Sequence, residues 1–432
     1  MEKHFKTAKT PSEAIDRLQA IYDASTENLR EALKSYIDDG TPPDAKARAK
    51  GAFAYPELRV HYETDGSPPP ISRAFGKFSE PGLYRLAITE PSLFRPYLEE
   101  QLGLLQDQYP ITIETGPSDE EIAFSYVLDG SQDIDLDKAS AADLVRHFPY
   151  ADLARIDDAV PNGERSPSPG EARPLGLFDA PRVDYSLQRI RHYTGTPYED
   201  VQQFILFTNY HRYVDAFVAW AIRQLKEDNE YESLSAAGFV TVDADTRNPR
   251  AAVEGAPWRR FQMPAYHLKA PGGRGITLVN IGVGPSNAKT ITDHLAVLRP
   301  QCWLMIGHCG GLRYSQRQGD YVLAHAYLRY DRVLDRDLPQ EIPVPPIAEI
   351  QIALANAVKT VSGDSREDLK RRLRTGTVAT YADRNWELRF HAEARRINQS
   401  RAIAVDMESA TIAANGFRFR VPYGTLLCVS HQ

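Results

Sequence analysis

Two glycine-rich turns and one acidic pair are the parts of this chain whose residue types and spacing point to chemistry. The turns are residues 282–285 (Gly-Val-Gly-Pro) and 307–311 (Gly-His-Cys-Gly-Gly), and each follows an apolar run typical of a buried strand. The acidic pair is Asp406 and Glu408, at the end of a third apolar run. Glycines at strand ends let backbone N–H groups approach an anion or a sugar hydroxyl, and open α/β sheets bind ligands at that edge. We therefore expect a ligand site where these strands end.

The two glycine-rich segments can also be purely structural, and their spacing matches no known nucleotide-binding motif. Glycines such as Gly284 and Gly310 also make tight turns without binding anything. Asn287 stands where the dinucleotide fingerprint needs its third glycine, and the phosphate-loop spacing is absent as well. Glu408 is either a structural ion pair or helix cap, or it holds a ligand hydroxyl, because carboxylates are rarely buried without a partner.

Four other side chains are candidates with alternatives left open. Arg212 follows the strand at 204–207 and either binds an anion at a helix start or is simply solvated. His308 either donates to a phosphate or hydroxyl or caps a turn. Trp386 either stacks on an aromatic ligand or belongs to the core. Cys309, between glycines, is expected to be a small packed residue rather than a nucleophile.

Composition limits the class of protein. A chain of 432 residues is too long for one core, so two domains are expected. The net charge of −7 argues against bulk binding to nucleic acid or to an anionic membrane. The three cysteines form no Cys-x-x-Cys pair, and the first ten residues are polar, so we expect a cytoplasmic protein. No metal-ligand spacing is found among the eleven histidines, so no metal and no required cofactor are expected.

The first part of the chain predicts an α+β domain. Thr-Pro-Ser-Glu at residues 10–13 is a capping box, and it predicts a helix that ends at Gly40. The segments expected to follow are strands at 58–62, 73–78, 84–89 and 111–114, and helices at 92–108 and 138–157. Residues 159–177 are rich in Pro, Gly, Ser and charge, which indicates an exposed linker. The domains are accordingly placed at 1–177 and 178–432.

The second part alternates strands and helices, which predicts a mostly parallel sheet covered by helices on both faces. Its central unit is a strand at 276–281, a helix at 288–298 capped by Ser286, and a strand at 302–306. The other segments expected are strands at 204–207, 321–327, 374–380, 402–406 and 421–429, and helices at 184–193, 213–225, 347–360 and from 408.

These motifs resemble those of the nucleoside phosphorylase superfamily. The longer strings look like the AMP nucleosidase family of that superfamily: RHYTGTP (191–197), NIGVGPSNAKT (280–290), GHCGGLR (307–313), DRNWELR (383–389) and DMESATIAA (406–414). The resemblance covers essentially the whole chain. It implies a phosphorylase-type mixed sheet with helices on both faces, preceded by an α+β domain with a regulatory and assembly role.

The resemblance also implies an activity and site residues. The expected reaction is hydrolysis of AMP to adenine and ribose 5-phosphate, within purine metabolism. Glu408 matches the glutamate that holds the ribose hydroxyls, Met407 the residue at the nucleoside, and Arg212 the phosphate arginine. The segment around Trp386 matches the loop that lines the base. Gly284, His308 and Gly310 complete the expected binding set, with His308 a second candidate for the 5′-phosphate. The family is hexameric, activated allosterically by MgATP and inhibited by phosphate.

Two departures from the family pattern affect the expected reaction. Met305 occupies the place where many phosphorylases carry an arginine for the phosphate co-substrate, which favours water as the nucleophile. The family's last strand ends in Val-Ser-Asp, and that aspartate is the general acid for the base; here His431 follows Ser430. We therefore expect a C-terminally truncated copy. The alternatives are a catalytically silent nucleotide-binding homologue and, less favoured, a purine nucleoside phosphorylase.

Overall fold

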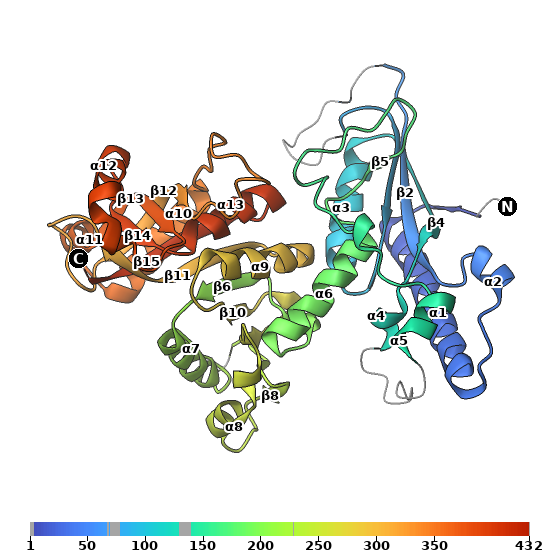
Figure 1. The fold of residues 1–432 in the computed structure, drawn as a ribbon, viewed down its shortest axis with the longest axis horizontal. Coiled ribbons are helices and arrows are strands. Elements are labelled where there is room, and N and C mark those ends of the chain that lie inside the picture. Colours follow the sequence, from blue (N-terminus) through green and yellow to red (C-terminus); the bar gives the residue numbers. More distant parts are fainter. Residues whose placement is uncertain (1–3, 67–68, 70–77, 129–139, 228, 432) are drawn as a thin grey trace. The chain divides into compact units, whose positions relative to one another are not determined.

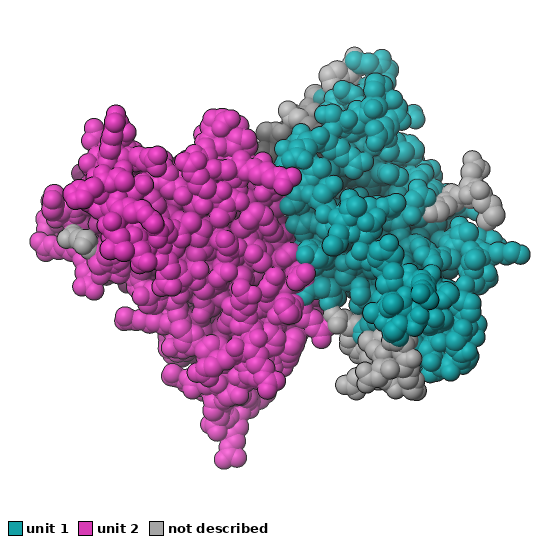
Figure 2. Space-filling model, viewed as in Figure 1, with its two compact units in different colours: residues 1–188 teal, residues 189–432 magenta. Residues whose placement is uncertain are grey.

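The computed structural model describes residues 4–66, 69, 78–128, 140–227 and 229–431 (Figure 1). The chain forms two compact units, unit 1 over residues 1–188 and unit 2 over residues 189–432 (Figure 2). The division falls inside helix α6 (Ala180–Thr194), a little after the boundary at 177 expected from composition.

Unit 1 begins with the long helix α1 (Pro11–Asp39), whose two ends are set by local sequence. The Thr10 side chain accepts a hydrogen bond from the Glu13 N–H at 3.2 Å, and the Glu13 carboxylate accepts one from the Lys9 N–H at 2.7 Å. Gly40, in the left-handed region at φ 71°, closes the helix through its N–H to the Tyr36 carbonyl. The predicted helix is therefore confirmed at both ends.

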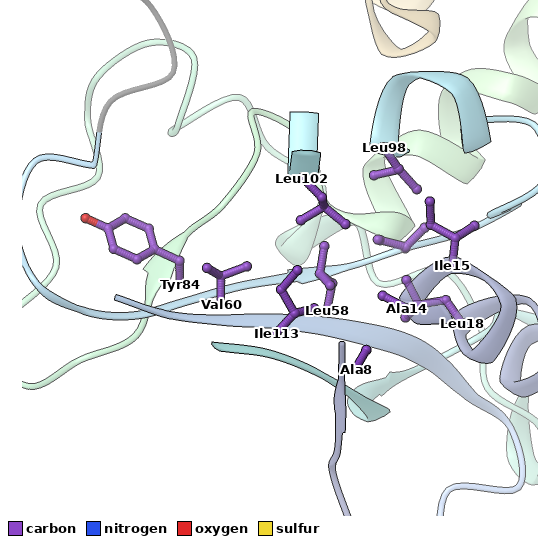
Figure 3. Close-up of a cluster of buried hydrophobic side chains, with 11 residues drawn as sticks. Ala8, Ala14, Ile15, Leu18, Leu58, Val60, Tyr84, Leu98, Leu102 and Ile113 are labelled. Atoms are coloured by element: carbon purple, nitrogen blue, oxygen red, sulfur yellow. The ribbon is translucent and has the colours of Figure 1, made fainter. Parts of the chain in front are cut away.

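A five-stranded sheet in the order β1-β4-β2-β3-β5 forms the rest of the unit 1 framework. The strands are β1 (Lys6–Ala8), β2 (Ala54–Tyr62), β3 (Gly82–Ala87), β4 (Ile111–Glu121) and β5 (Arg173–Pro174). The helices after α1 are α2 (Ala45–Ala49), α3 (Arg95–Gln108), α4 (Phe124–Leu128), α5 (Ala141–His147) and the 3-10 turn η2 (Leu153–Arg155). Figure 3 shows Ile15 and Leu18 of α1 and Leu98 and Leu102 of α3 gathered with Leu58 of β2 in one buried cluster. The expected α+β domain is confirmed.

Three expectations for unit 1 need correction or fall outside the described residues. The helix expected at 138–157 is confirmed only over α5 and is too long at its C-terminal end: α5 stops at His147, because Phe148 is extended before Pro149. Most of the strand expected at 73–78 lies outside the described residues. The segment 159–177 is not all exposed linker, because its Arg173–Pro174 pairs in parallel with Tyr84 and Arg85 of β3.

Unit 2 is built on a ten-stranded sheet in the order β14-β13-β12-β15-β11-β6-β10-β9-β7-β8. The strands, in chain order, are β6 (Phe204–Thr208), β7 (Ser233–Ala236), β8 (Val240–Val242), β9 (Ala265–Lys269), β10 (Ile276–Asn280), β11 (Cys302–Gly311), β12 (Tyr321–Tyr330), β13 (Leu373–Tyr381), β14 (Ala404–Asp406) and β15 (Tyr423–His431). The central run β15-β11-β6-β10 is parallel. The strands β9, β7 and β8 at one end are antiparallel, as is the pairing of β12 with β15. The pairs β12–β13 and β13–β14 are parallel as well. The sheet is therefore mixed, as the resemblance implies: five of its nine neighbouring pairs are parallel, and the expected parallel arrangement does not extend to β9, β7 and β8.

The central β10–α9–β11 unit is present, with two differences from its prediction. Helix α9 (Pro285–Leu295) is preceded by Gly284 and has no side-chain cap, so Ser286 is not the cap residue. Strand β11 continues through residues 307–311, so the second glycine segment is strand rather than turn. The reason is pairing on both sides, since Gly310 lies opposite both Val405 of β14 and His431 of β15.

The remaining helices of unit 2 connect these strands. They are α7 (His211–Gln224), α8 (Pro249–Gly255), α10 (Ala348–Ser362), α11 (Arg366–Arg372), α12 (Phe390–Ser400) and α13 (Ser409–Phe419), with 3-10 turns η3 (Tyr198–Asp200), η4 (Trp258–Arg260), η5 (Pro271–Gly273), η6 (Ala296–Leu298) and η7 (Trp386–Arg389). Across the described part of the chain, no helix combines the length and apolar character needed to cross a membrane.

Candidate active site

Glu408 is the centre of the candidate site, in the short step between β14 and α13. Its side chain is 1% exposed. One carboxylate oxygen accepts the backbone N–H of Gly284 at 2.6 Å, and the other accepts the Asn209 side-chain amide at 2.9 Å. Gly284 follows β10 and Asn209 follows β6. The sheet therefore brings three strand ends, distant in sequence, to one carboxylate.

Gly284 makes this arrangement possible through its backbone conformation. Its φ of 116° lies in a region that L side chains rarely adopt, and it directly precedes α9. In this conformation the Gly284 N–H points at the Glu408 carboxylate. The anion that this N–H meets is a carboxylate of the protein itself, so ligand binding by the turn stays a prediction.

Asp406 holds the segment that carries Glu408. It is 5% exposed and accepts hydrogen bonds from the Thr380 hydroxyl at 2.6 Å, from the Ser409 N–H at 2.8 Å and from the Ser409 hydroxyl. Asp406 thus caps the start of α13, whereas Glu408 makes no side-chain cap. No ion pair to Glu408 is found among the described residues. The interpretation of Glu408 as a structural ion pair or cap is therefore not supported.

The pKa of Glu408 is raised by its surroundings and lowered by its hydrogen bonds. Burial, followed by the nearby Asp406 carboxylate, raises the pKa of Glu408 above its ordinary value. The hydrogen bonds from Gly284 and Asn209 stabilise the ionised form and lower it. The pKa of Asp406 is raised as well, chiefly by burial. Any activity that needs ionised Glu408 should therefore rise with pH through a raised pKa.

Replacing Asp406 by asparagine should shift the pH dependence of activity to lower pH. The Asp406→Asn change removes the neighbouring carboxylate, so the pKa of Glu408 falls and the side chain stays ionised at lower pH. The acid limb of kcat/KM against pH should then shift down by roughly one pH unit, the size of effect expected from a close like charge. The profile is measured as adenine release from AMP.

The control is Asp245→Asn, which removes an exposed carboxylate of the same unit. Its acid limb should coincide with that of the unchanged chain. An acid limb that stays in place in Asp406→Asn, with the variant folded as judged by its Tm, would contradict the coupling of the two carboxylates.

His308 lies on β11 among aromatic rings. Its ring meets Tyr210 edge to face at 4.5 Å between centroids and is tilted against Tyr213 at 5.3 Å. Burial, and then the nearby Arg212, lowers the pKa of His308. Its Nδ1 is buried without a hydrogen-bond partner in the described structure. Arg212 is exposed in the first turn of α7. The structure thus brings these two phosphate candidates together.

Gly310 is flanked by strands that both lead to the site. It lies opposite Val405, which precedes Asp406, and opposite His431 at the end of β15. A Cβ at Gly310 would stand 3.3 Å from His431 Nε2, so the absence of a side chain leaves room for the imidazole. The exposed His431 also hydrogen-bonds Ser430 through Nδ1 at 2.8 Å.

Trp386 and Met407 are both half-buried. The Trp386 ring stacks on Tyr381 at 5.7 Å between centroids and 25°, and it packs against a cluster that includes Val405. One face of Trp386 is therefore occupied by protein. Cys309 is buried and burial raises the pKa of its thiol, as suits a packed residue rather than a nucleophile.

Comparison with known proteins identifies the family. Residues 13–172 match the family described as bacterial AMP nucleoside phosphorylase N-terminus, and residues 242–432 match the phosphorylase superfamily. The chain is 57% identical over 424 residues to AMP nucleosidase of Escherichia coli (strain K12), a match that covers 98% of this chain and 87% of that protein. The figures for AMP nucleosidase of Escherichia coli O157:H7 are the same. The chain belongs to the AMP nucleosidase family.

A solved AMP nucleosidase, from Bacteroides thetaiotaomicron VPI-5482, is also similar. It is 26% identical with a TM-score of 0.45, and the match covers 57% of this chain and 89% of that one. The family resemblance drawn from the sequence motifs is thus confirmed by the full-length relatives.

Asn209 contacts the candidate residue Glu408, and the sequence analysis did not identify it. It directly follows β6, three residues before the candidate Arg212, and its amide donates a hydrogen bond to Glu408. Its position at a strand end was a usable signal. What the sequence lacked was the strand order, which places β6 next to β10 and both near β14 through β11.

Proposed function

We propose that the chain is an AMP nucleosidase that hydrolyses the N-glycosidic bond of AMP to adenine and ribose 5-phosphate. The observation that carries this proposal is Glu408, a buried carboxylate held by the Gly284 N–H and the Asn209 amide. The relatives that share 57% of its residues over nearly the whole chain are AMP nucleosidases. We assign Glu408 to the ribose hydroxyls.

The chemistry of the bond explains why such a carboxylate is useful. As the bond to the base breaks, positive charge develops on the ribose and negative charge on the purine. A fixed carboxylate beside the ribose stabilises the positive charge because it is already oriented in a water-poor site. The held geometry of Glu408 satisfies that requirement. Met407 and Trp386 are proposed to contact the nucleoside and the base, with Gly284 and Gly310 at the edges of the site.

The leaving purine also needs a proton. We propose that His431 donates it, because its imidazole lies against Gly310 at the end of β15, in the position where the family pattern has its aspartate. The 5′-phosphate is assigned to Arg212 and His308, one cationic and one with a buried ring nitrogen that has no partner in the described structure.

Water rather than phosphate is the proposed nucleophile. Met305, at the place of the phosphorylase arginine, is fully buried on β11 and offers no cation to a phosphate co-substrate. Product analysis tests this choice. In phosphate-free buffer AMP should give adenine and ribose 5-phosphate, and added phosphate should not yield a 1-phosphorylated sugar. Adenine release that requires phosphate would instead identify a phosphorylase.

We further propose the family's assembly and control for this chain. These are a cytoplasmic homo-hexamer, activated by MgATP and inhibited by phosphate, with unit 1 as the regulatory and assembly part. The match of residues 13–172 to the AMP nucleoside phosphorylase N-terminus supports this assignment, since that part is additional to the phosphorylase unit. Neither nucleic acid nor membrane is a proposed partner.

A further inference from the structure

Asn209 carries a buried side-chain oxygen, Oδ1, that has no hydrogen-bond partner among the described residues. The residue directly follows β6, and its Nδ2 donates a hydrogen bond to Glu408 Oε2 at 2.9 Å. An ionised carboxylate accepts hydrogen bonds and donates none, so Glu408 faces the nitrogen of this amide and Oδ1 points away from it. Buried acceptors are normally satisfied, so a partner that donates a hydrogen is expected at Oδ1.

The missing side chain of the buried Gly307 on β11 leaves room beside this oxygen. A Cβ at Gly307 would stand 3.4 Å from Asn209 Oδ1, 3.1 Å from Met305 Cε and 3.9 Å from Leu427 Cδ2. The room beside Oδ1 is therefore bounded by one acceptor and by two methyl groups that cannot donate to it. A molecule that fits there is small and brings its own O–H, as water does.

The contact between Asn209 and Glu408 places this oxygen next to the proposed ribose position. One Glu408 oxygen accepts from Gly284 and the other from Asn209, and each keeps a further lone pair for a ribose hydroxyl. The hydroxyls therefore have acceptors without Oδ1. In ribose, C1′ is bonded to the carbon that carries the 2′-hydroxyl. A ribose whose hydroxyls bind Glu408 thus brings C1′, the carbon attacked in hydrolysis, near Oδ1.

We propose that Asn209 is a catalytic residue whose Oδ1 accepts a hydrogen bond from the water that attacks C1′ of AMP. The inference rests on the proposed hydrolysis and names the group that holds its nucleophile. A lone pair of the held water forms the C1′–O bond, while the C1′–N9 bond breaks and its electron pair goes to the purine. The purine gains a proton from the general acid, and the attacking water loses one to solvent. Asn209 orients the water and exchanges no proton itself.

Competition between water and methanol in the full chain tests this role. Water gives ribose 5-phosphate and methanol gives its methyl glycoside, and the ratio of the two products is independent of the overall rate. A nucleophile bound to Oδ1, with a lone pair on C1′, turns its remaining substituent toward Met305 and Leu427. That substituent is a hydrogen in water and a methyl in methanol, so the hydrogen bond to Asn209 should favour water.

Three variants separate this role from the support that Asn209 gives to Glu408. Asn209→Ala should lower kcat about three- to tenfold and raise the methyl glycoside fraction about threefold or more, because the hydrogen bond to the nucleophile is lost. Asn209→Asp keeps an oxygen at this position, so its product ratio should stay unchanged although the second carboxylate beside Glu408 lowers kcat/KM. Gly307→Ala leaves the Asn209 contact and fills the room beside Oδ1, so both kcat and the methyl glycoside fraction should fall. The control is Asn398→Ala, an exposed asparagine of α12, which should change neither quantity.

The outcomes separate failure of this role from failure of the proposed function. An unchanged product ratio in Asn209→Ala, or an equal rise in Asn209→Asp, would overturn the role and leave hydrolysis of AMP standing. Loss of discrimination between AMP and its 2′-deoxy analogue in Asn209→Ala, with the product ratio unchanged, would show that Oδ1 binds a ribose hydroxyl instead. If the Tm shows that Asn209→Ala does not fold, Gly307→Ala decides, and its full kcat would overturn the role. An unchanged chain that releases no adenine would refute the proposed function and this role together.

Discussion

Replacing Glu408 by glutamine should lower kcat/KM for AMP by about 10- to 100-fold, because a hydrogen bond to a charged group contributes roughly 1.5–3 kcal/mol. Glutamine keeps the size of the side chain and one oxygen for the Gly284 N–H. It removes the negative charge that stabilises the ribose cation, and it turns an amide toward the Asn209 amide or toward Gly284. The measurement is the initial rate of adenine release over a range of AMP concentrations.

The site geometry explains why this loss should appear in turnover as well as in binding. The carboxylate is already held by two donors before substrate arrives, so its charge acts on the transition state without reorganisation. Glu367→Gln, an exposed carboxylate on α11, is the control and should keep full activity. Full kcat/KM in Glu408→Gln would show that the ribose is held elsewhere.

Replacing His431 by alanine should lower kcat by about 100-fold, the lower end of the contribution of a positioned general acid. The imidazole lies against Gly310 and is oriented by Ser430, so its removal takes away the proposed proton donor without disturbing buried packing. KM should change little, because the side chain acts on the leaving base rather than on the ribose or phosphate. Single-turnover adenine release gives this comparison most directly.

The matched control is His325→Ala, which removes an exposed histidine of β12. His431→Asp provides a second comparison, because it places at 431 the carboxyl that the family pattern has there, and it should retain adenine release. Unchanged kcat in His431→Ala would mean that solvent supplies the proton to the base.

Features set by neighbouring residues were predictable from the sequence. The helix α1 was predicted at both ends because Thr10, Glu13 and Gly40 act within one or two turns of the chain. The position of Glu408 between a strand and a helix was also predictable, since the apolar run before it and the helix signal after it are local. For the same reason the segment was recognisable as a family motif.

Features set by pairing between distant strands were not predictable. Residues 307–311 read as a turn because of their glycines, yet partners on both sides extend β11 through them. The antiparallel strands β7, β8 and β9 were missed, since their short sequences carry little signal apart from their neighbours. The bond from Asn209 to Glu408 depends on strand order across the sheet, and so does the placement of His431 beside Gly310.

A cavity of unit 1 whose lining includes Arg85, Arg165 and Arg173 could not be predicted either. The arginines of its lining come from β3, η2, β5, α6 and the segment between η2 and β5. Composition alone predicts only an exposed linker at 159–177. Composition identified the polar character of that segment correctly. Only the fold shows that Arg165 and Arg173, both within it, turn toward a shared cavity with Arg85.

The most direct test of AMP nucleosidase activity is adenine release from AMP by the purified 432-residue chain, measured beside AMP binding in the same preparation. We expect adenine and ribose 5-phosphate to appear in equal amounts, at a rate proportional to the protein concentration and strongly reduced in Glu408→Gln. AMP that binds without any release of adenine would contradict this expectation and would identify a catalytically silent nucleotide-binding homologue.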